Sequence, residues 1–485
     1  MEVRMGIGYL PLEIFDQILA YLYHEDIVAL SATCTQIREL TVSLVYRTIR
    51  LEPQGSAPSL DTDRARHFYE LFRDQPLLAD YVRHVELPYI DPKAMDRYGD
   101  HPWNSCIYLL AQMRNLTEIR IDDCWLRIGS TMKGVGRRLE SSLVPALQGG
   151  TLERLEVAGP HKEGLCASTF WSRRFHKFIG HCFSSRSLKS LTIPVPPGFK
   201  STDIPRGACG LPALEELKLY WRGRTVWKSL KHMLSQASNL SRLAIITCQP
   251  DGDQHQYIHW DEVSVALDNV KNSLEQLIIR IDYGNSSTSE VGSFGCLSLH
   301  DFQKLEMLEI PGYVLHARDL DLGLDGEAER FRDIFPPHLQ ELTVRTSNHH
   351  IWWHSLLHGI DEDASESAII QEITGVKNAA KRLRFVHEYD SLVSVTQKSW
   401  LANFEDSAHA PCCEAGVEFS LAIRRPAERS LRSSNGSALF EVPWDNLMVL
   451  TNFDPLWRGS YEPEDFWRLL PLVAEDDMFA WLFQG

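Results

Sequence analysis

Three histidines gather in the stretch SNHHIWWH, and their spacing raises the question of a metal site. His350 and His354 are four residues apart, with His349 beside them, and two ligands at that spacing share one helix face in many zinc sites. The glutamate of the H-E-x-x-H motif is missing, however, and Trp352 and Trp353 indicate packing. We therefore expect ordinary surface and core histidines here.

Other motifs that carry chemistry are incomplete. The acidic stretch that starts at Asp251 places Gln256 where a calcium-binding EF-hand loop needs glycine. The stretch KGVGRRLE (133–140) lacks the third glycine of a dinucleotide-binding loop, and the chain has no G-x-x-x-x-G-K-[ST] phosphate loop. The sequence predicts no catalytic constellation, no metal and no cofactor, so we expect a protein that is not an enzyme.

The charge balance argues against a nucleic-acid partner. The chain has 65 acidic and 49 basic residues, a net charge of -16, whereas phosphate contacts need clustered Lys and Arg. We find no secretion signal and no apolar stretch of membrane-spanning length. The ten cysteines form no C-x-x-C pair, so free thiols in a reducing compartment are expected, cytoplasmic and/or nuclear.

A hexapeptide pattern, L-x-x-L-x-L, recurs through most of the chain. Its eight clear copies are LTEIRI (116–121), LERLEV (152–157), LKSLTI (188–193), LEELKL (214–219), LSRLAI (240–245), LEQLII (274–279), LEMLEI (305–310) and LQELTV (339–344). Weaker copies are VRHVEL (82–87) and AKRLRF (380–385). Each copy reads as a short strand, and helical segments lie between several copies, for example residues 173–185, 225–238 and 263–273.

One such unit cannot bury its apolar side alone, so neighbouring units should stack. Two copies resemble the leucine-rich-repeat template as far as its ninth-position cysteine, at Cys124 and Cys248. The other copies carry different residues there and are degenerate. This resemblance implies an α/β fold, an irregular leucine-rich-repeat solenoid with parallel strands inside the curve and helices outside. A single sheet without repeats is the weaker alternative.

A concave strand face would offer the residue between the last two aliphatics of each copy to a partner. We name as client-binding candidates Arg120, Glu156, Thr192, Lys218, Ile278, Glu309 and Thr343, and Ala244 holds the same position. Their mixture of charged and small side chains selects no particular ligand. The geometry of such a face favours a protein or peptide over a small molecule.

The first fifty residues read as three short helices. The first helix follows Leu10-Pro11, since proline in a first turn sacrifices no intrahelical hydrogen bond. Its apolar residues are Ile14, Ile18 and Leu22, with Phe15 and Leu19 beside them. Asp26 is expected to cap the second helix, whose apolar face is Ile27, Leu30 and Cys34. A third helix is expected from Thr35 to about Tyr46, with Ile37, Leu40, Leu44 and Val45 inward, and TIRLEP after it reads as a short strand.

So small a unit cannot bury all of this apolar surface by itself. From composition alone, packing against the rest of the chain is the simpler interpretation. The alternative is an exposed patch that marks a partner site.

The motif residues favour the second interpretation, because the segment resembles the F-box family, of the fungal type. The resemblance rests on the L-P-x-E-I opening, the D-[LI]-x-x-L-S turn and the cysteine before the third helix. It implies docking onto the Skp adaptor of a cullin–RING ubiquitin ligase. The adaptor-binding residues it implies are Leu10, Pro11, Ile14, Ile18, Leu22, Leu30, Cys34 and Ile37, of which Leu10 and Pro11 are the first choice by analogy.

The resemblance thus implies the substrate-recognition subunit of an SCF-type (Skp–cullin–F-box) ubiquitin ligase, in which the repeats bind a protein client. The alternative is a leucine-rich-repeat scaffold outside the ubiquitin system. We expect an F-box at 8–50, a linker and first helical segment at 51–80, the solenoid at 81–425, and an aromatic, acidic cap at 426–485.

Overall fold

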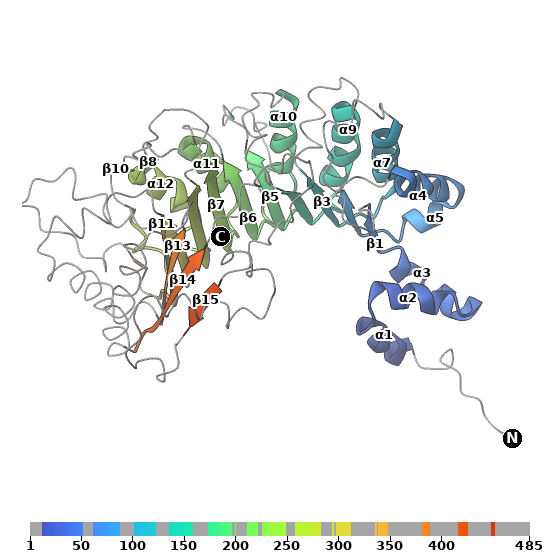
Figure 1. The fold of residues 1–485 in the computed structure, drawn as a ribbon. Helices are drawn as coiled ribbons and strands as arrows, with labels where there is room; N and C mark the ends of the chain where they lie inside the picture. Colours follow the sequence, from blue (N-terminus) through green and yellow to red (C-terminus); the bar gives the residue numbers. More distant parts are fainter. Residues whose placement is uncertain are drawn as a thin grey trace, which may run out of the picture. The chain divides into compact units, whose positions relative to one another are not determined.

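In a computed structural model of the protein the chain divides into two compact units, Met1–Leu240 and Ser241–Gly485. Figure 1 labels the helices and strands of both units. The described residues are 12–51, 62–87, 101–122, 135–158, 173–195, 199, 211–221, 226–248, 258–282, 293–294, 297–311, 335–336, 338–347, 381–388, 416–424 and 448–451.

The first unit begins with the three short helices and the strand that the sequence predicts. They are α1 (Leu12–Ala20), α2 (His24–Ser31), α3 (Thr35–Val45) and β1 (Thr48–Arg50). The helices, which we call the head, surround a core of Phe15, Leu19, Ile27 and Ile37, with Leu22, Leu30, Leu44 and Val45 packed against it. The expected apolar periodicity therefore produces a small core of its own.

Three local expectations for the head were wrong. Tyr23, not Asp26, is the N-cap of α2, and Asp26 lies in the first turn, where its Oδ2 accepts the Tyr23 N–H at 3.2 Å. Cys34 is the exposed N-cap of α3 and does not lie on the apolar face of α2. Leu40 is exposed on α3 where an inward side chain was expected.

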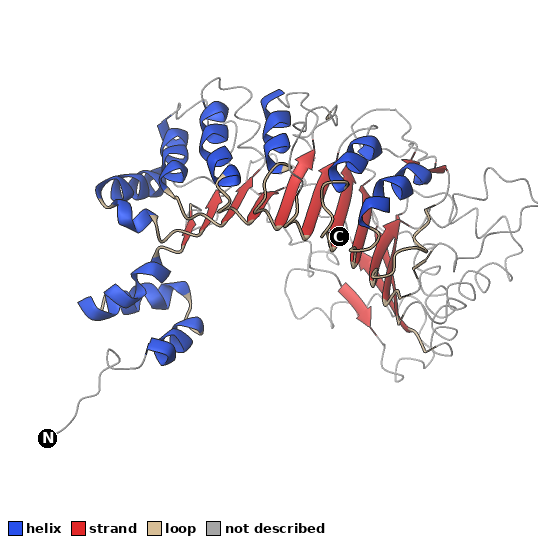
Figure 2. Ribbon diagram, turned by 180° about the vertical axis from the view of Figure 1, so that it is seen from behind, coloured by secondary structure: helices blue, strands red, loops and turns tan. Residues whose placement is uncertain are grey.

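The rest of the first unit alternates helices with parallel strands. The helices are α4 (Thr62–Asp74), α5 (Pro76–Ala79), α7 (His101–Gln112), α9 (Val135–Gln148), α10 (Arg173–Cys182) and α11 (Val226–Leu234). The strands are β2 (His84–Leu87), β3 (Glu118–Asp122), β4 (Arg154–Ala158), β5 (Ser190–Val195) and β6 (Glu216–Trp221). Strands β1 to β6 pair in chain order, all parallel. Helices α7, α9 and α10 lie on one face of these strands (Figure 2), as the crossovers between parallel strands require.

The second unit is built on the same kind of parallel sheet. Its strands are β7 (Arg242–Cys248), β9 (Gln276–Asp282), β11 (Met307–Pro311), β12 (Glu341–Ser347), β13 (Arg382–Glu388) and β14 (Glu418–Arg424), all parallel. Strand β15 (Met448–Thr451) pairs antiparallel with β14. Helix α12 (Trp260–Leu267), a 3₁₀ turn (Asp268–Val270) and the short parallel pair β8 (Ile258–His259) and β10 (Ser293–Phe294) complete the described elements.

Every clear copy of the hexapeptide contributes one strand to these sheets, as predicted, and so do the two weaker copies. The aliphatic residues of neighbouring copies stand opposite one another, as in the row Leu155, Leu191 and Leu217. All three aliphatics of each clear copy are buried. In-register stacking explains why one six-residue pattern suffices for so long a sheet.

A backbone hydrogen-bond pattern repeats with the hexapeptide. The carbonyl of the second residue in one copy accepts the N–H groups of the second and third residues in the next. The Thr117 carbonyl, for example, accepts the Glu153 N–H at 2.8 Å and the Arg154 N–H at 3.0 Å. The same pair of hydrogen bonds forms at the carbonyls of Arg47, Arg83, Glu153, Lys189, Ser241, Glu275, Glu306 and Gln340. The backbone thus satisfies its own polar groups at these turns.

The strand predicted at TIRLEP already belongs to the sheet, because β1 pairs with β2. Only Tyr46 and Arg47 separate α3 from β1, so the Pro- and Gly-rich stretch at 52–63 follows the first strand and does not lie between head and sheet. The histidines at 349–354 and the tryptophans of the predicted C-terminal cap lie outside the described residues. Among the described helices, none combines the length and the apolar character that crossing a bilayer requires.

Candidate functional site

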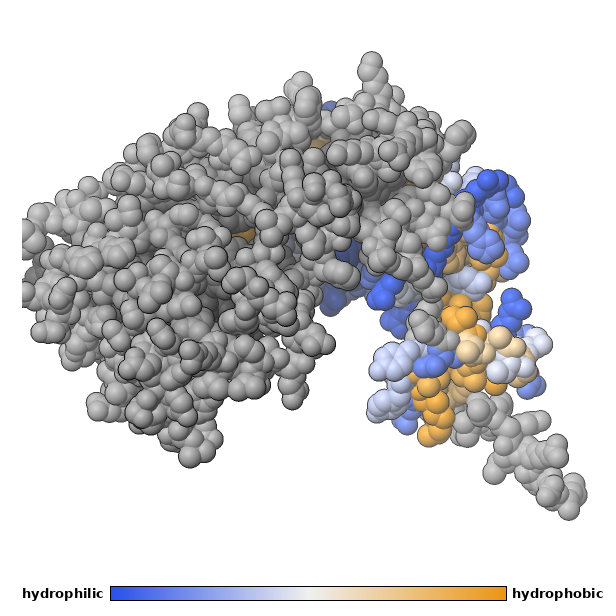
Figure 3. Space-filling view, viewed as in Figure 1, coloured by the Kyte–Doolittle hydropathy of each residue, from blue (hydrophilic) through white to orange (hydrophobic). Residues whose placement is uncertain are grey.

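Helix α1 has two apolar faces, of which its own core uses one. Phe15 and Leu19 are 2% and 4% exposed, whereas Ile14 and Ile18 are 44% and 41% exposed. Because residues four apart share a helix face, the buried pair and the exposed pair form separate stripes. Figure 3 shows apolar side chains at the surface of the head. An apolar stripe that stays exposed beside the described helices of the head is typical of a partner site.

The exposed apolar surface of the head extends beyond α1. We define the head surface as the exposed large hydrophobic residues of α1 to α3 and their turns, which are Ile14, Ile18, Tyr21, Tyr23, Val28 and Leu40. Sequence reasoning missed Tyr21, Tyr23 and Val28 as candidates. Two aromatic residues flanking Leu22 at a helix break were the available signal.

The structure separates the eight predicted adaptor-binding residues into different environments. Leu10 and Pro11 lie outside the described residues. Ile14, Ile18 and Cys34 are exposed, Leu22 and Leu30 are half-buried against the head core, and Ile37 is buried within it. Ile37 therefore holds the three helices together, and the exposed residues remain candidates for contact with a partner.

The head is joined directly to the sheet. The Tyr46 ring at the end of α3 meets the Phe72 ring of α4 edge to face, with centroids 6.2 Å apart. The Arg47 carbonyl accepts the N–H groups of Arg83 and His84, at 2.9 and 3.0 Å. Buried Thr41 donates its hydroxyl to the Ile37 carbonyl at 2.8 Å, which satisfies that hydroxyl inside α3. The residue after the head thus makes the same pair of backbone hydrogen bonds that links successive strands.

A second candidate surface is the face of the first unit opposite its helices. The predicted client residues Arg120, Glu156, Thr192 and Lys218 stand in one row across β3 to β6, each opposite the next. Arg120 and Glu156 form an exposed ion pair at 3.5 Å. The Lys218 ammonium lies 5.2 Å from the centroid of the Tyr220 ring, a cation–π contact.

Polar pairs join each neighbouring pair of strands from β1 to β6. They are Arg50–Glu86 at 3.2 Å, His84–Glu118 at 2.8 Å, Arg120–Glu156 at 3.5 Å, Lys189–Glu153 at 2.9 Å and Ser190–Glu216 at 3.2 Å. Cross-strand pairs of this kind stabilise a sheet modestly. Among the residues of the row on β3 to β6, Arg120 and Glu156 thereby balance each other's charge.

The corresponding row of the second unit is less accessible. Glu309 stands opposite Ile278 on β9 and Thr343 on β12. Ile278 is half-buried, but Glu309 and Thr343 are buried. Two of the predicted client residues therefore have little surface to offer a partner in this structure.

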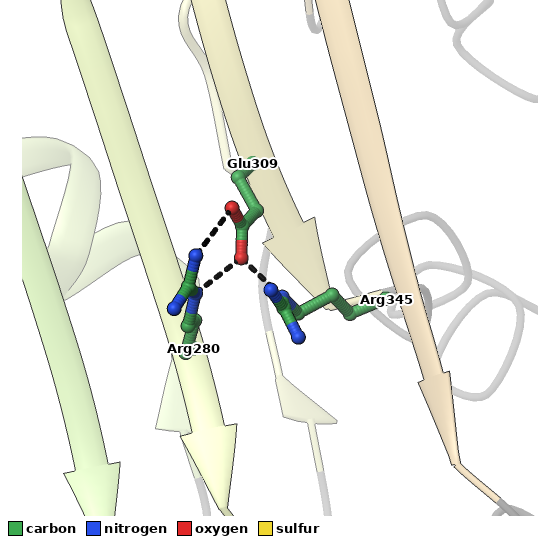
Figure 4. A network of polar contacts seen from close by, with 3 residues as sticks. All are labelled: Arg280, Glu309 and Arg345. Atoms are coloured by element: carbon green, nitrogen blue, oxygen red, sulfur yellow. Dashed lines mark hydrogen bonds and ion pairs between the residues drawn. The ribbon is translucent and has the colours of Figure 1, made fainter. Parts of the chain in front are cut away.

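Glu309 lies between two arginines of the adjacent strands (Figure 4). Arg280 on β9 donates from Nε and Nη2 to the two carboxylate oxygens, at 2.5 and 3.0 Å. Arg345 on β12 donates from Nε to Oε1. Burial alone would raise the pKa of Glu309, but the Arg280 hydrogen bonds and the positive charge of Arg345 outweigh it and lower that pKa. Arginines at the seventh position of two copies were the sequence signal for this network.

The described residues bring no three metal-ligating side chains of the His, Cys, Asp or Glu types together. Burial raises the pKa of the Cys106 thiol to about 12, and it raises that of Cys182 as well. Both thiols are therefore neutral packing residues at physiological pH.

Comparisons with known proteins bear mainly on the head. No curated protein matches the chain. One similar solved structure is the crystal structure of the Rad7 and Elc1 complex in yeast, at 14% identity and a TM-score of 0.26, over 78% of this chain and 86% of that chain. The model of the F-box-like family matches residues 7–52. The three-helix head of this chain is an F-box-like domain.

Proposed function

We propose that this protein is the client-recruiting subunit of an SCF-type ubiquitin ligase. In this proposal the head docks onto a Skp-family adaptor, which links it to a cullin–RING enzyme. The protein catalyses nothing itself. It raises the concentration of a bound client near the ubiquitin-conjugating enzyme, an effect of proximity. We place its action in the cytoplasm or the nucleus.

One observation supports the proposal most strongly. The match to the F-box-like family covers residues 7–52, and inside that range α1 leaves Ile14 and Ile18 exposed while Phe15 and Leu19 fill the core. The head core is thus complete without the exposed stripe. A stripe that the fold does not need is available to a second polypeptide.

The client surface in this proposal is the open face of the first unit. There Arg120, Glu156 and Lys218 are at least partly accessible, and no described helix of that unit covers the row that they share. We also interpret the hexapeptide copies as degenerate leucine-rich repeats of a solenoid, since each supplies one strand and takes part in the repeated pair of backbone hydrogen bonds. Because Arg120 and Glu156 of this row pair with each other, we expect shape and hydrogen bonding to contribute to client selection.

The test is binding of the full-length protein to a recombinant Skp-family adaptor. The two should co-elute in size-exclusion chromatography and bind in isothermal titration calorimetry. The double variant Ile14→Glu/Ile18→Glu should lose binding, because it places two carboxylates in the apolar contact. Val265→Glu is the matched control, since Val265 is equally exposed on α12 of the second unit.

Absence of binding by the wild-type protein would leave the alternative, a leucine-rich-repeat scaffold outside the ubiquitin system. If binding holds, the Ile14→Glu/Ile18→Glu variant also serves to capture clients in cells. Bound clients should accumulate on that variant, because they are no longer delivered to the ligase.

A further inference from the structure

Two tyrosines at the turn between α1 and α2 are the most exposed large apolar side chains of the described chain. Tyr21 is 89% exposed and Tyr23 is 82% exposed. Neither belongs to the motif residues from which the F-box resemblance was drawn. An aromatic side chain with so large an exposed fraction has most of its surface area available for burial against a partner.

The backbone that carries both tyrosines is fixed by hydrogen bonds. The Tyr21 N–H donates to the Ile18 carbonyl at 3.1 Å, and the Leu22 N–H donates to the Leu19 carbonyl at 3.2 Å. Tyr23 donates its N–H to the Asp26 carboxylate, and its carbonyl accepts the Ile27 N–H at 3.1 Å. Half-buried Leu22 between the tyrosines packs on the head core. The two rings are therefore presented from a defined turn, which lowers the entropy cost of binding.

Tyr21 is the first residue after α1 and follows exposed Ile18 by three residues. Its N–H donates to the Ile18 carbonyl, so the turn that carries Tyr21 starts from the last turn of the helix. Tyr23 comes next along the chain, at the N-cap of α2. All four residues lie within the range that matches the F-box-like family. Their closeness along the chain makes one partner the simplest occupant of all four positions.

We propose that Tyr21 and Tyr23 are anchor residues for the same adaptor that contacts Ile14 and Ile18. This inference rests on the proposed function. It assigns to Tyr21 and Tyr23 a large share of the affinity for the adaptor. The partner surface is an apolar groove with hydrogen-bond acceptors at its rim, because each ring brings a large apolar body and a hydroxyl donor at its tip. Tyrosine is among the residues that most often dominate interface energies.

The experiment measures adaptor binding of full-length Tyr21→Ala, Tyr23→Ala, Tyr21→Phe and Tyr23→Phe by calorimetry. Each alanine variant should weaken binding by about tenfold or more, the loss expected of an interface anchor. Each phenylalanine variant should keep most of the affinity, since the ring remains. Tyr81→Ala, an exposed tyrosine in the turn after α5, is the matched control and should bind like wild type. Unchanged thermal unfolding of all variants shows that the head still folds.

The outcomes separate this inference from the function on which it rests. If the wild type binds and Ile14→Glu/Ile18→Glu does not, but both tyrosine-to-alanine variants bind normally, the anchor role is wrong and the function stands. If the wild type binds no adaptor, both are wrong. If light scattering shows a dimer of the free chain that Tyr21→Ala converts to a monomer, the tyrosines contact a second copy and the adaptor assignment is overturned.

Discussion

Arg280 holds Glu309 through two parallel hydrogen bonds, from Nε to one carboxylate oxygen at 2.5 Å and from Nη2 to the other at 3.0 Å. This two-point geometry is the strongest that a guanidinium offers a carboxylate. Arg345 donates to the same carboxylate from the opposite strand. The three residues thus join β9, β11 and β12 across a buried part of the second unit, which makes Glu309 a structural residue.

Removing that carboxylate should destabilise the second unit. Glu309→Ala leaves two guanidinium groups without the charge between them, and breaking a buried pair in this way costs about 3–5 kcal/mol. Urea unfolding followed by circular dichroism measures the loss. Glu306→Ala, at an exposed position of the preceding turn, should change the free energy of unfolding little. Equal stability of the two variants would contradict the structural role.

Acid should weaken the same network. The folded-state pKa of Glu309 is lowered relative to the unfolded chain, so its contribution to stability is fully present above the unfolded pKa of about 4.3. It is lost as the pH falls through the lower, folded pKa. The difference in unfolding free energy between wild type and Glu309→Gln should therefore shrink as the pH falls below about 4.3. A difference that stays constant across that range would show that ionisation of Glu309 does not matter.

Neighbouring residues on α1 should respond in opposite ways to truncation. Phe15→Ala removes a ring from the head core and should cost about 3–5 kcal/mol, whereas Ile14→Ala at the exposed stripe should stay within about 0.5 kcal/mol. Hydrogen–deuterium exchange over residues 12–45 reports head unfolding directly. Fast exchange in Ile14→Ala would mean that the exposed stripe is part of the fold.

The cross-strand ion pairs of the first unit should contribute little to stability. Arg120 and Glu156 are both about half exposed, and such pairs contribute about 0–1 kcal/mol. A double-mutant cycle with Arg120→Ala and Glu156→Ala measures their coupling, which should fall further in high salt. A coupling well above this range would show that the pair is shielded from solvent.

Thiol labelling should distinguish Cys34 from Cys106 and Cys182. Burial raises the pKa of Cys106 to about 12, and Cys182 is likewise buried, whereas Cys34 is exposed at the N-cap of α3. Iodoacetamide at about pH 8 should modify Cys34 first, because alkylation needs an accessible thiolate. Peptide mass spectrometry reads the order, and early labelling of Cys106 would show that α7 opens readily.

The hexapeptide copies show which parts of the fold a local sequence pattern can predict. Ile119 and Ile121 alternate as a strand requires, with Leu116 just before the strand, and the structure buries all three and pairs β3 with the strand of the next copy. The apolar pattern is enough to predict this burial, because each copy packs against neighbouring copies with the same pattern. The three head helices were predictable for a similar reason, since their apolar spacing matches 3.6 residues per turn.

Other features depend on what packs where. Nothing in the spacing of Ile14 and Phe15 says which of them faces inward, because both belong to apolar series on α1. Asp26 is a good N-cap by type, but Tyr23 occupies that position, and Asp26 lies three residues later in the first turn of α2, where it accepts the Tyr23 N–H. Glu309 holds the same repeat position as exposed Glu156, and only the arginines beside it and its burial distinguish the two.

By itself, the sequence determined the three-helix head, the positions of the strands and their aliphatic core, because apolar periodicity acts between residues close in the chain or in equivalent copies. The tertiary structure decided which stripe of α1 stays exposed, that the strand after the head pairs with β2, and that Glu309 is enclosed by arginines. Those outcomes depend on contacts between residues distant in the chain, and such contacts produce no regular spacing in the sequence from which they could be predicted.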